Sequence, residues 1–174
     1  MAKASVVFTK DNEYYTPKSV IDYFGKFDYD PATCYEKALE FDVKSFDTIH
    51  NYISFEDNIV RKGAISAKKG ERVIIPMNMR DGCIIAIGKG NEDWNCSAPH
   101  GAGRIMSRIK AKETFNLNEY KESMKDIYTT SVNENTIDEA PFVYKPMQEI
   151  IDNIKDTVEI EKIIKPIYNF KAND

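Results

Sequence analysis

The pattern of apolar and polar positions in the middle of the chain predicts two neighbouring β-strands. Apolar residues dominate 71–76 and 83–88, which is typical of strands that are buried on both faces. Between these runs lies Asp81-Gly82, a pair that favours a tight turn. We therefore expect a hairpin, or two strands buried side by side, over residues 71–88.

Helical patterns lie on both sides of this region. Thr16-Pro17 is typical of a helix start, and Gly25 ends that short segment. Over residues 103–115, apolar positions alternate with basic ones, which predicts a helix whose N-terminus lies just after His100. Further expected elements are helices that begin at Asn118 and Pro146 and short strands at 27–31, 158–161 and 166–171.

This mixture of strands and flanking helices places residues 50–171 in the α+β class, whereas residues 1–49 are expected to be short and irregular. A length of 174 residues with 42% hydrophobic content suffices for a sizeable core. The net charge of -4 argues against a wholly basic nucleic-acid coat protein. Three cysteines without a C-x-x-C pair, and no secretory leader, suggest reduced thiols and a cytoplasmic protein. No apolar run approaches the roughly 18 residues of a membrane span.

The strongest candidate for chemistry is His100, which is followed by Gly101-Ala102-Gly103-Arg104. An imidazole can attack a phosphorus atom, glycines let backbone N–H groups approach phosphate oxygens, and an arginine neutralises their charge. The alternative is a histidine that caps a helix or completes a hydrogen bond in the core. Basic residues that follow, Arg108, Lys110 and Lys112, form either a solvated face or a track for a phosphate backbone.

His50 is the only other histidine, and Asn51 follows it. Neutral imidazole is a good ligand for manganese, zinc or iron, although a lone histidine can equally be structural. No H-E-x-x-H motif or cysteine cluster accompanies it, so further ligands would come from scattered carboxylates or another chain. Asp138-Glu139 is either a pair of carboxylates for acid–base work or a solvated turn before Pro141.

From about His50 to Lys171, the chain resembles the C-terminal part of the RtcB family of RNA-splicing ligases. The motifs that carry the resemblance are His50–Ile53, Arg61–Ala64, Val73–Gly82, Ser97–Arg104 with Met106–Arg108, Asp138–Pro141 and Lys171. The resemblance implies an RNA ligase that joins 3'-phosphate or 2',3'-cyclic phosphate ends to 5'-hydroxyl ends, using GTP and Mn²⁺. It implies the C-terminal portion of the RtcB-like fold for residues 50–174, with a guanylate-binding role.

The resemblance also implies a role for individual residues. His100 corresponds to the histidine that attacks the α-phosphorus of GTP and becomes linked to GMP. His50 corresponds to a histidine that binds the metal and lies at the nucleotide, with Asn51 beside it. The implied contacts to the guanylate are Pro76, Met77, Asn78, Met79, Gly101, Ala102, Gly103 and Lys171, together with Cys83, where relatives usually have serine.

The first 49 residues resemble a different family. Glu13–Asp22 and Phe27–Thr33 are similar to the opening of phage-type DNA N-6-adenine methyltransferases. The catalytic D/N-P-P-Y/F/W motif of those enzymes is missing, because no two prolines are adjacent. We therefore expect two segments, a methyltransferase-like fragment at 1–49 and the ligase-like portion at 50–174. Binding of S-adenosylmethionine would be the test of a DNA-modifying role.

Two functional readings of the ligase-like portion stay open. One is an RNA ligase that is incomplete as a stand-alone enzyme, because family members carry an upstream aspartate, a cysteine and further histidines, whereas this chain has two histidines. The other is a noncatalytic fragment that binds guanine nucleotide or RNA ends and needs a complementary ligase fragment. Broken RNA ends or tRNA halves are the expected partners, and no membrane is expected.

Overall fold

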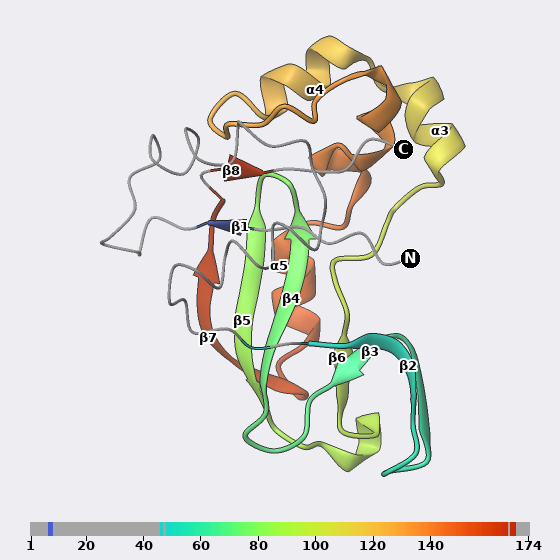
Figure 1. Ribbon diagram of the computed structural model, residues 1–174, viewed down its shortest axis with the longest axis vertical. Coiled ribbons are helices and arrows are strands. Elements are labelled where there is room, and N and C mark those ends of the chain that lie inside the picture. Colours follow the sequence, from blue (N-terminus) through green and yellow to red (C-terminus); the bar gives the residue numbers. More distant parts are fainter. Residues whose placement is uncertain (1–6, 9–45, 47, 167, 170–174) are drawn as a thin grey trace.

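The predicted hairpin forms the centre of the largest sheet. The computed structural model describes residues 7–8, 46, 48–166 and 168–169 (Figure 1). Strands β4 (Arg72–Asn78) and β5 (Gly82–Gly88) pair antiparallel, and β7 (Val158–Ile164) pairs antiparallel with the other edge of β5. Asn78 closes the turn, because its side-chain oxygen accepts from the backbone N–H groups of Arg80 at 3.0 Å and Asp81 at 2.8 Å. The hairpin prediction is therefore confirmed, and the strand expected at 158–161 is present as part of β7.

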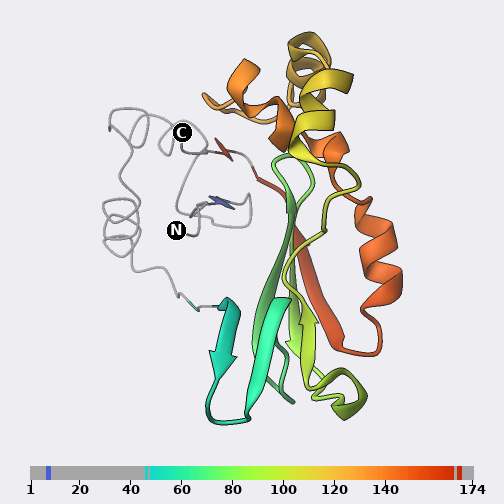
Figure 2. The same ribbon diagram turned by 90° about the vertical axis from the view of Figure 1, so that its right-hand side faces the viewer.

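A second antiparallel sheet consists of β2 (His50–Ser54), β3 (Ile59–Ser66) and β6 (Ser97–Pro99), in the order β2-β3-β6. Figure 2 shows it as the cyan and green strands beside the main sheet. The register between β2 and β3 shifts between His50 and Tyr52. Between the pairs that these two residues form with β3, β2 has one residue, Asn51, whereas β3 has three, so the extra residues of the bulge lie on β3 at 62–64. Asn51 has a φ of 56°, in the left-handed region. A short ladder of β1 (Val7–Phe8) with β8 (Tyr168–Asn169) forms the third sheet, and β8 confirms a strand within 166–171.

Helices α4 (Leu117–Ser123) and α5 (Met147–Asn153) begin within a residue of the expected positions. Asn116 caps α4 in a reciprocal capping box with Glu119. The start of α3 (Arg108–Thr114) corrects the expectation of a helix from Gly103. Gly103 has a φ of 71°, and Ser107 caps the helix by accepting from the N–H of Lys110 at 3.2 Å. The histidine-glycine turn is therefore not a helix N-terminus.

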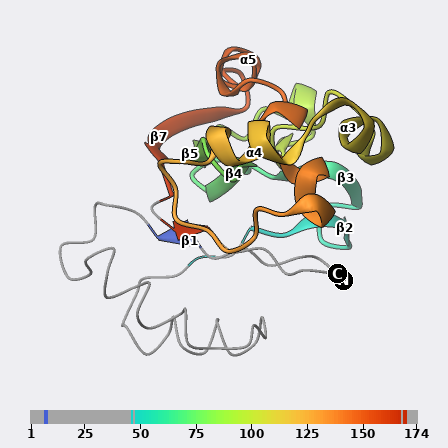
Figure 3. The ribbon, with the colours of Figure 1, turned by 90° about the horizontal axis from the view of Figure 1, so that it is seen from above.

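The core has two main parts. The larger part lies between α5 and one face of β4-β5-β7, where Ile150 and Ile154 pack with Val73, Ile75 and Ile84. The smaller part lies under α4 and the 3₁₀ segments η2 (Glu134–Glu139) and η3 (Pro141–Val143), seen from above in Figure 3. A third 3₁₀ turn, η1 (Glu92–Trp94), precedes β6.

Antiparallel sheets with a few flanking helices confirm the α+β class. The helix expected at 16–25 and the strand expected at 27–31 lie outside the described residues. Within the described part of the chain, no helix has the length and apolar character needed to cross a bilayer.

Candidate functional site

The two histidines of the chain lie against one another. The imidazole rings of His50 and His100 are stacked, with their centroids 5.1 Å apart and their planes 7° from parallel. His50 is the first residue of β2, and His100 follows the last residue of β6. The strand between them, β3, pairs with both. The sheet therefore brings together two side chains that are fifty positions apart in the sequence.

His100 is held by its backbone and enclosed along one side of its ring. Its N–H donates to the carbonyl oxygen of Gly63 at 3.2 Å. The residue is half-buried, and its Nδ1 atom is buried without a hydrogen-bond partner among the described residues. The accessible edge of the ring is therefore the one that carries Nε2. A Cβ atom at position 63 would lie 3.7 Å from the ring atoms Nδ1 and Cε1.

Asn51, next to His50 on β2, is bonded to the same glycine, which lies in the bulge of β3. Its side-chain oxygen accepts from the N–H of Gly63 at 2.7 Å. Gly63 itself has a φ of 69°, a conformation that glycine adopts without the strain of a side chain. The peptide groups of Gly63 thus contact both Asn51 and His100, which fixes the separation between the start of β2 and the end of β6.

The Gly101-Ala102 segment packs against the free edge of β4. The N–H of Ala102 donates to the carbonyl oxygen of Pro76 at 3.1 Å, and a Cβ atom at Gly101 would lie 3.1 Å from that oxygen. The segment from Pro76 and the glycine-rich turn, both of which the resemblance assigns to the guanylate, are therefore neighbours. Gly103 is exposed, and its carbonyl oxygen accepts a hydrogen bond from the backbone N–H of Lys145 at 3.0 Å.

The remaining residues of the Pro76 segment face the interior. Met77 and Met79 are 3% and 2% exposed and belong to the two core clusters. Asn78 is engaged in the β4-β5 turn, where its Nδ2 also donates to Asp81 at 2.8 Å. A ligand at this place would therefore meet the backbone of Met77 and Met79 and not their side chains.

Cys83 lies opposite Pro76 on β5 and is 4% exposed. It packs with Ile85 and Ile164. Burial raises the pKa of its thiol to about 11, an effect only partly offset by a hydrogen bond with the backbone of Met77. The side chain is a neutral, enclosed thiol in this structure.

Arg104, which is expected to neutralise phosphate charge, is paired within the protein. Its guanidinium lies 5.4 Å from the centre of the Tyr144 ring and 3.7 Å from the carboxylate of Glu139. It also donates to the carbonyl oxygens of Asp138 and, at 3.3 Å, of Met106. The arrangement supports the backbone after His100 and pairs the charge of Arg104 with that of Glu139.

The carboxylates at 138–139 also compensate the basic face of α3. Asp138, 6% exposed, lies 3.6 Å from Arg108 and 3.7 Å from Lys112. Glu139 lies 3.7 Å from Arg108 and accepts from the hydroxyl of Tyr144. Burial and this carboxylate both raise the pKa of that phenol. The pair is neither a solvated turn nor an isolated acid–base dyad, since it provides the counter-charge for α3.

A family model described as tRNA-splicing ligase RtcB matches residues 12–172. The chain belongs to the RtcB family. It is 38% identical over 129 residues to the RNA-splicing ligase RtcB of Escherichia coli K12, which covers 71% of this chain and 31% of that protein. It is 30% identical over 155 residues to the tRNA-splicing ligase RtcB of Methanococcus maripaludis, covering 73% and 32%.

The tRNA-splicing ligase RtcB of Nanoarchaeum equitans is 27% identical over 164 residues, covering 75% of this chain and 34% of that protein. The chain thus spans about a third of the length of these RtcB relatives. The range of the family match includes residues 12–49, for which the likeness to methyltransferases stays a prediction.

The described part of this RtcB chain does not by itself form a metal centre. Within it, no three histidine, cysteine, aspartate or glutamate side chains converge as a metal would require. His50 is exposed at the edge of the stack and stays a candidate for a single ligand. Lys171, the expected guanine contact, lies outside the described residues.

The sequence did not indicate a role at the site for two residues near the histidine pair. Gly63 and Arg61 belong to a motif that the RtcB resemblance includes. Their residue types did not indicate that Gly63 bonds to His100 or that Arg61 bonds to both β2 and β6. Arg61 is 2% exposed. Next to this motif a pocket of about 590 Å³ opens between β3, β6 and α5, lined among others by Gly63, Pro99 and Lys145.

Proposed function

We propose that this chain carries the nucleotide-accepting histidine of an RtcB-type RNA ligase. The observation that supports the proposal best is the stacked pair of His50 and His100, with the Nε2 edge of His100 accessible beside the glycine-rich turn. A flat ring packed over His100 limits rotation of the imidazole, so its nitrogen stays oriented for attack. The family membership supports RNA ends as the substrate class.

In the proposed reaction the lone pair of His100 Nε2 attacks the α-phosphorus of GTP. A P–N bond forms, the bond from that phosphorus to the bridging oxygen breaks, and pyrophosphate leaves with the electron pair. An oxygen of an RNA 3'-phosphate then takes the guanylyl group, and the electron pair of the P–N bond returns to the imidazole. A 5'-hydroxyl finally displaces GMP, which leaves a phosphodiester. In the first step the ring proton must reside on Nδ1, the enclosed nitrogen.

In this proposal the backbone of the glycine-rich turn, and not its side chains, faces the phosphate groups of the nucleotide. Gly101, Ala102 and Gly103 bring peptide groups close to the ring without bulky atoms, as a bound nucleotide phosphate requires. Arg104 supports this turn through its contacts with Glu139 and Tyr144. Manganese enters no step here, because the described residues do not complete a site for it. Dependence on GTP and Mn²⁺, and a cytoplasmic location, stay predictions.

A second candidate function is a noncatalytic fragment that binds guanine nucleotide or RNA ends together with a complementary ligase chain. Two observations favour it: the chain spans about a third of its relatives, and the described residues gather no complete metal centre. In this case the imidazoles and the peptide groups of the glycine-rich turn would hold GMP without forming a covalent bond to it.

Labelled GTP distinguishes the two candidates. The full chain is incubated with GTP labelled at the α-phosphate and Mn²⁺, alongside His100→Asn and, as a matched control, Lys69→Asn at an exposed position. Acid-labile label on the wild-type chain and on the control, but not on His100→Asn, supports the ligase role. Absence of label from every chain contradicts autonomous guanylylation. Calorimetric binding of GMP without label then supports the second candidate.

A further inference from the structure

The β3 motif that contains Arg61 and Gly63 has no role in the chemistry proposed above. We propose that Arg61 is a positioning residue for the histidine pair, acting with Gly63 to hold β2 and β6 at the separation that stacks His50 on His100. The inference rests on the proposed function for its importance in catalysis. The positioning itself can be measured without any activity.

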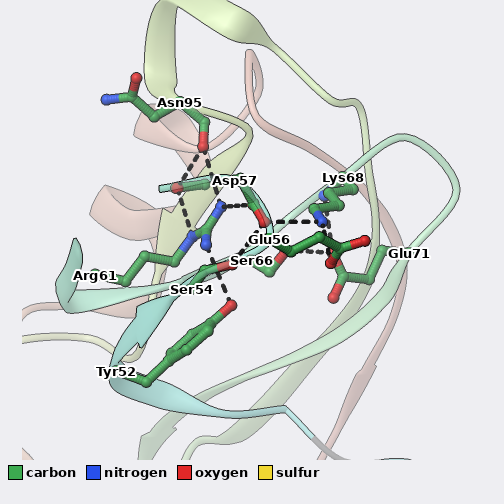
Figure 4. A network of polar contacts seen from close by, with 10 residues as sticks. Tyr52, Ser54, Glu56, Asp57, Arg61, Ser66, Lys68, Glu71 and Asn95 are labelled. Carbon is green, nitrogen blue, oxygen red and sulfur yellow. Dashed lines mark hydrogen bonds and ion pairs between the residues drawn. The ribbon is translucent and has the colours of Figure 1, made fainter. Parts of the chain in front are cut away.

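The guanidinium of Arg61 joins three different parts of the second sheet (Figure 4). Its Nε donates to the hydroxyl of Ser97 on β6 at 2.9 Å, and one terminal nitrogen donates to the hydroxyl of Tyr52 on β2 at 3.2 Å. The other terminal nitrogen donates to Asp57 in the hairpin turn at 3.4 Å and to the carbonyl of Asn95 at 3.3 Å. The planar fork of arginine can serve these directions at once, which a lysine ammonium cannot.

The positions of these partners relate Arg61 to both imidazoles. Tyr52 is two residues after His50 on β2, and Ser97 is three residues before His100 on β6. A slide of β6 relative to β2 would therefore move one ring across the other. A side chain anchored to both strands opposes that slide directly.

The charge of Arg61 is matched where it is buried. Asp57, whose carboxylate is 18% exposed, pairs with Arg61 and also with Lys68 at 3.2 Å. A hydrogen bond from Ser54, opposed by desolvation and aided by Lys68, holds the pKa of Asp57 below its usual value. An uncompensated buried guanidinium would be strongly destabilising, so the network keeps the fork in place.

Gly63, two residues further along β3, adds a second set of contacts to β2 and to the residue after β6. Its N–H donates to Asn51 and its carbonyl accepts from His100. Lys62 and Gly63 are both exposed, because β3 bulges at 62–64 and its regular alternation is interrupted there. Arg61 thus fixes the strands through side chains, and Gly63 fixes the residues next to the rings through its peptide groups.

The test uses the fact that the chain has two histidines. Histidine-selective isotope labelling gives two imidazole spin systems, and the stack predicts mutual ring-current shifts and cross-relaxation between the rings. We expect Arg61→Gln to abolish the cross-relaxation and to lower guanylylation at saturating GTP about tenfold or more, because small displacements of reacting groups cost large factors in rate. Arg61→Lys is expected to show less than half of the wild-type cross-relaxation between the two rings, while the affinity for GMP stays unchanged.

Arg72→Gln is the matched control, since Arg72 is an exposed arginine on another sheet that pairs with Glu161. It should leave the imidazole signals and the labelling rate unchanged. Ser97→Ala removes one anchor without altering charge, and it decides the question if Arg61→Gln does not fold. We expect it to shift the resonances of His100 and weaken the cross-relaxation.

Unaltered ring contacts in Arg61→Gln, or in Ser97→Ala where the former is unfolded, would overturn the inference. Such a result leaves labelling of the wild type, and with it the proposed function, untouched. If the wild-type chain takes no label while the variants still disturb the ring contacts, the proposed function fails and the positioning role stands.

Discussion

The side-chain oxygen of Asn51 accepts a hydrogen bond of 2.7 Å from the backbone N–H of Gly63. This bond connects the start of β2 with the bulge of β3, where the carbonyl oxygen of Gly63 also accepts from the N–H of His100. It stabilises a backbone conformation at Asn51, with φ of 56°, that most residues avoid. The geometry of the histidine pair therefore depends on Asn51, whose side chain bonds to Gly63 and not to the rings.

Replacing Asn51 separates the two contributions of this residue. Asn51→Gly keeps the left-handed backbone available but removes the acceptor, and we expect it to lower the free energy of unfolding by about 1 kcal/mol. Asn51→Ala loses the acceptor and adds backbone strain, so its loss should be about 2 kcal/mol. Urea denaturation followed by circular dichroism measures both. Equal losses in the two variants would show that the conformation at residue 51 carries no cost.

Two glycines with similar backbone angles predict unequal responses to alanine. Gly82 has a φ of 89°, and a Cβ atom there would collide with the carbonyl oxygen of Ile164. Gly70 has a φ of 82° and would meet no atom within 4 Å. We expect Gly70→Ala to cost about 1 kcal/mol of stability from strain alone, and Gly82→Ala to cost about 3 kcal/mol or more. Thermal and urea unfolding compare them, and similar midpoints would disprove the clash.

Cys83 should be a slow nucleophile. With a pKa of about 11, its thiolate fraction at pH 8 is about one in a thousand, and the side chain is also enclosed. Cys96 is half-buried and forms no disulfide, so it is the internal comparison. Alkylation by iodoacetamide at pH 8, followed by peptide mass mapping, should modify Cys96 well before Cys83. Modification of the two at equal rates would contradict the placement of Cys83 in the core.

Titration of the Cys83 thiol should lower the free energy of unfolding at alkaline pH. Its pKa is raised on folding from 9.0 to about 11, so the native state holds the proton more tightly than the unfolded chain. This contribution is fully present below pH 9 and is lost as the pH rises towards 11. In Cys83→Ala, which has no titrating group, the decline in unfolding free energy over this interval should be shallower. Parallel declines in the two proteins would refute it.

The pair Arg104–Glu139 should be more strongly coupled than an exposed pair. Its side chains are 23% and 12% exposed, whereas those of Arg72–Glu161 are 44% and 43% exposed. Double-mutant cycles with Arg→Met and Glu→Gln are expected to give about 1–2 kcal/mol for the first pair. The second pair should give about 0.5 kcal/mol or less, although its atoms are closer, because water screens it. The reverse order would show that burial does not govern these contacts.

The sequence predicts those parts of the fold whose signals are local. The β4-β5 hairpin follows from two apolar runs around Asp81-Gly82, and α4 and α5 follow from a cap and a proline at their starts. The sheet β2-β3-β6 was not predicted, because β3 carries charged residues and pairs with β6 more than thirty positions away. Its stability depends on Arg61 being satisfied in the interior, which a pattern of charges does not reveal.

For the candidate site, too, the sequence indicated single residues but not the contacts between them. His50 and His100 stood out one by one through residue type and motif, but their contact depends on the register of β3 with two strands. The pairing of Arg104 could not be predicted, because the carboxylate that it contacts is distant in the sequence. Glu139 reaches it only through the folding of η2 back onto the turn after His100.

Among the described residues, the ladder between β1 and β8 contains two residue pairs, Val7 with Asn169 and Phe8 with Tyr168. β5, by contrast, is bonded along both of its edges. Local opening costs least where few hydrogen bonds and contacts are lost together. Amide protons of β8 should thus be replaced by deuterium first, while those of β5 persist until the whole sheet opens.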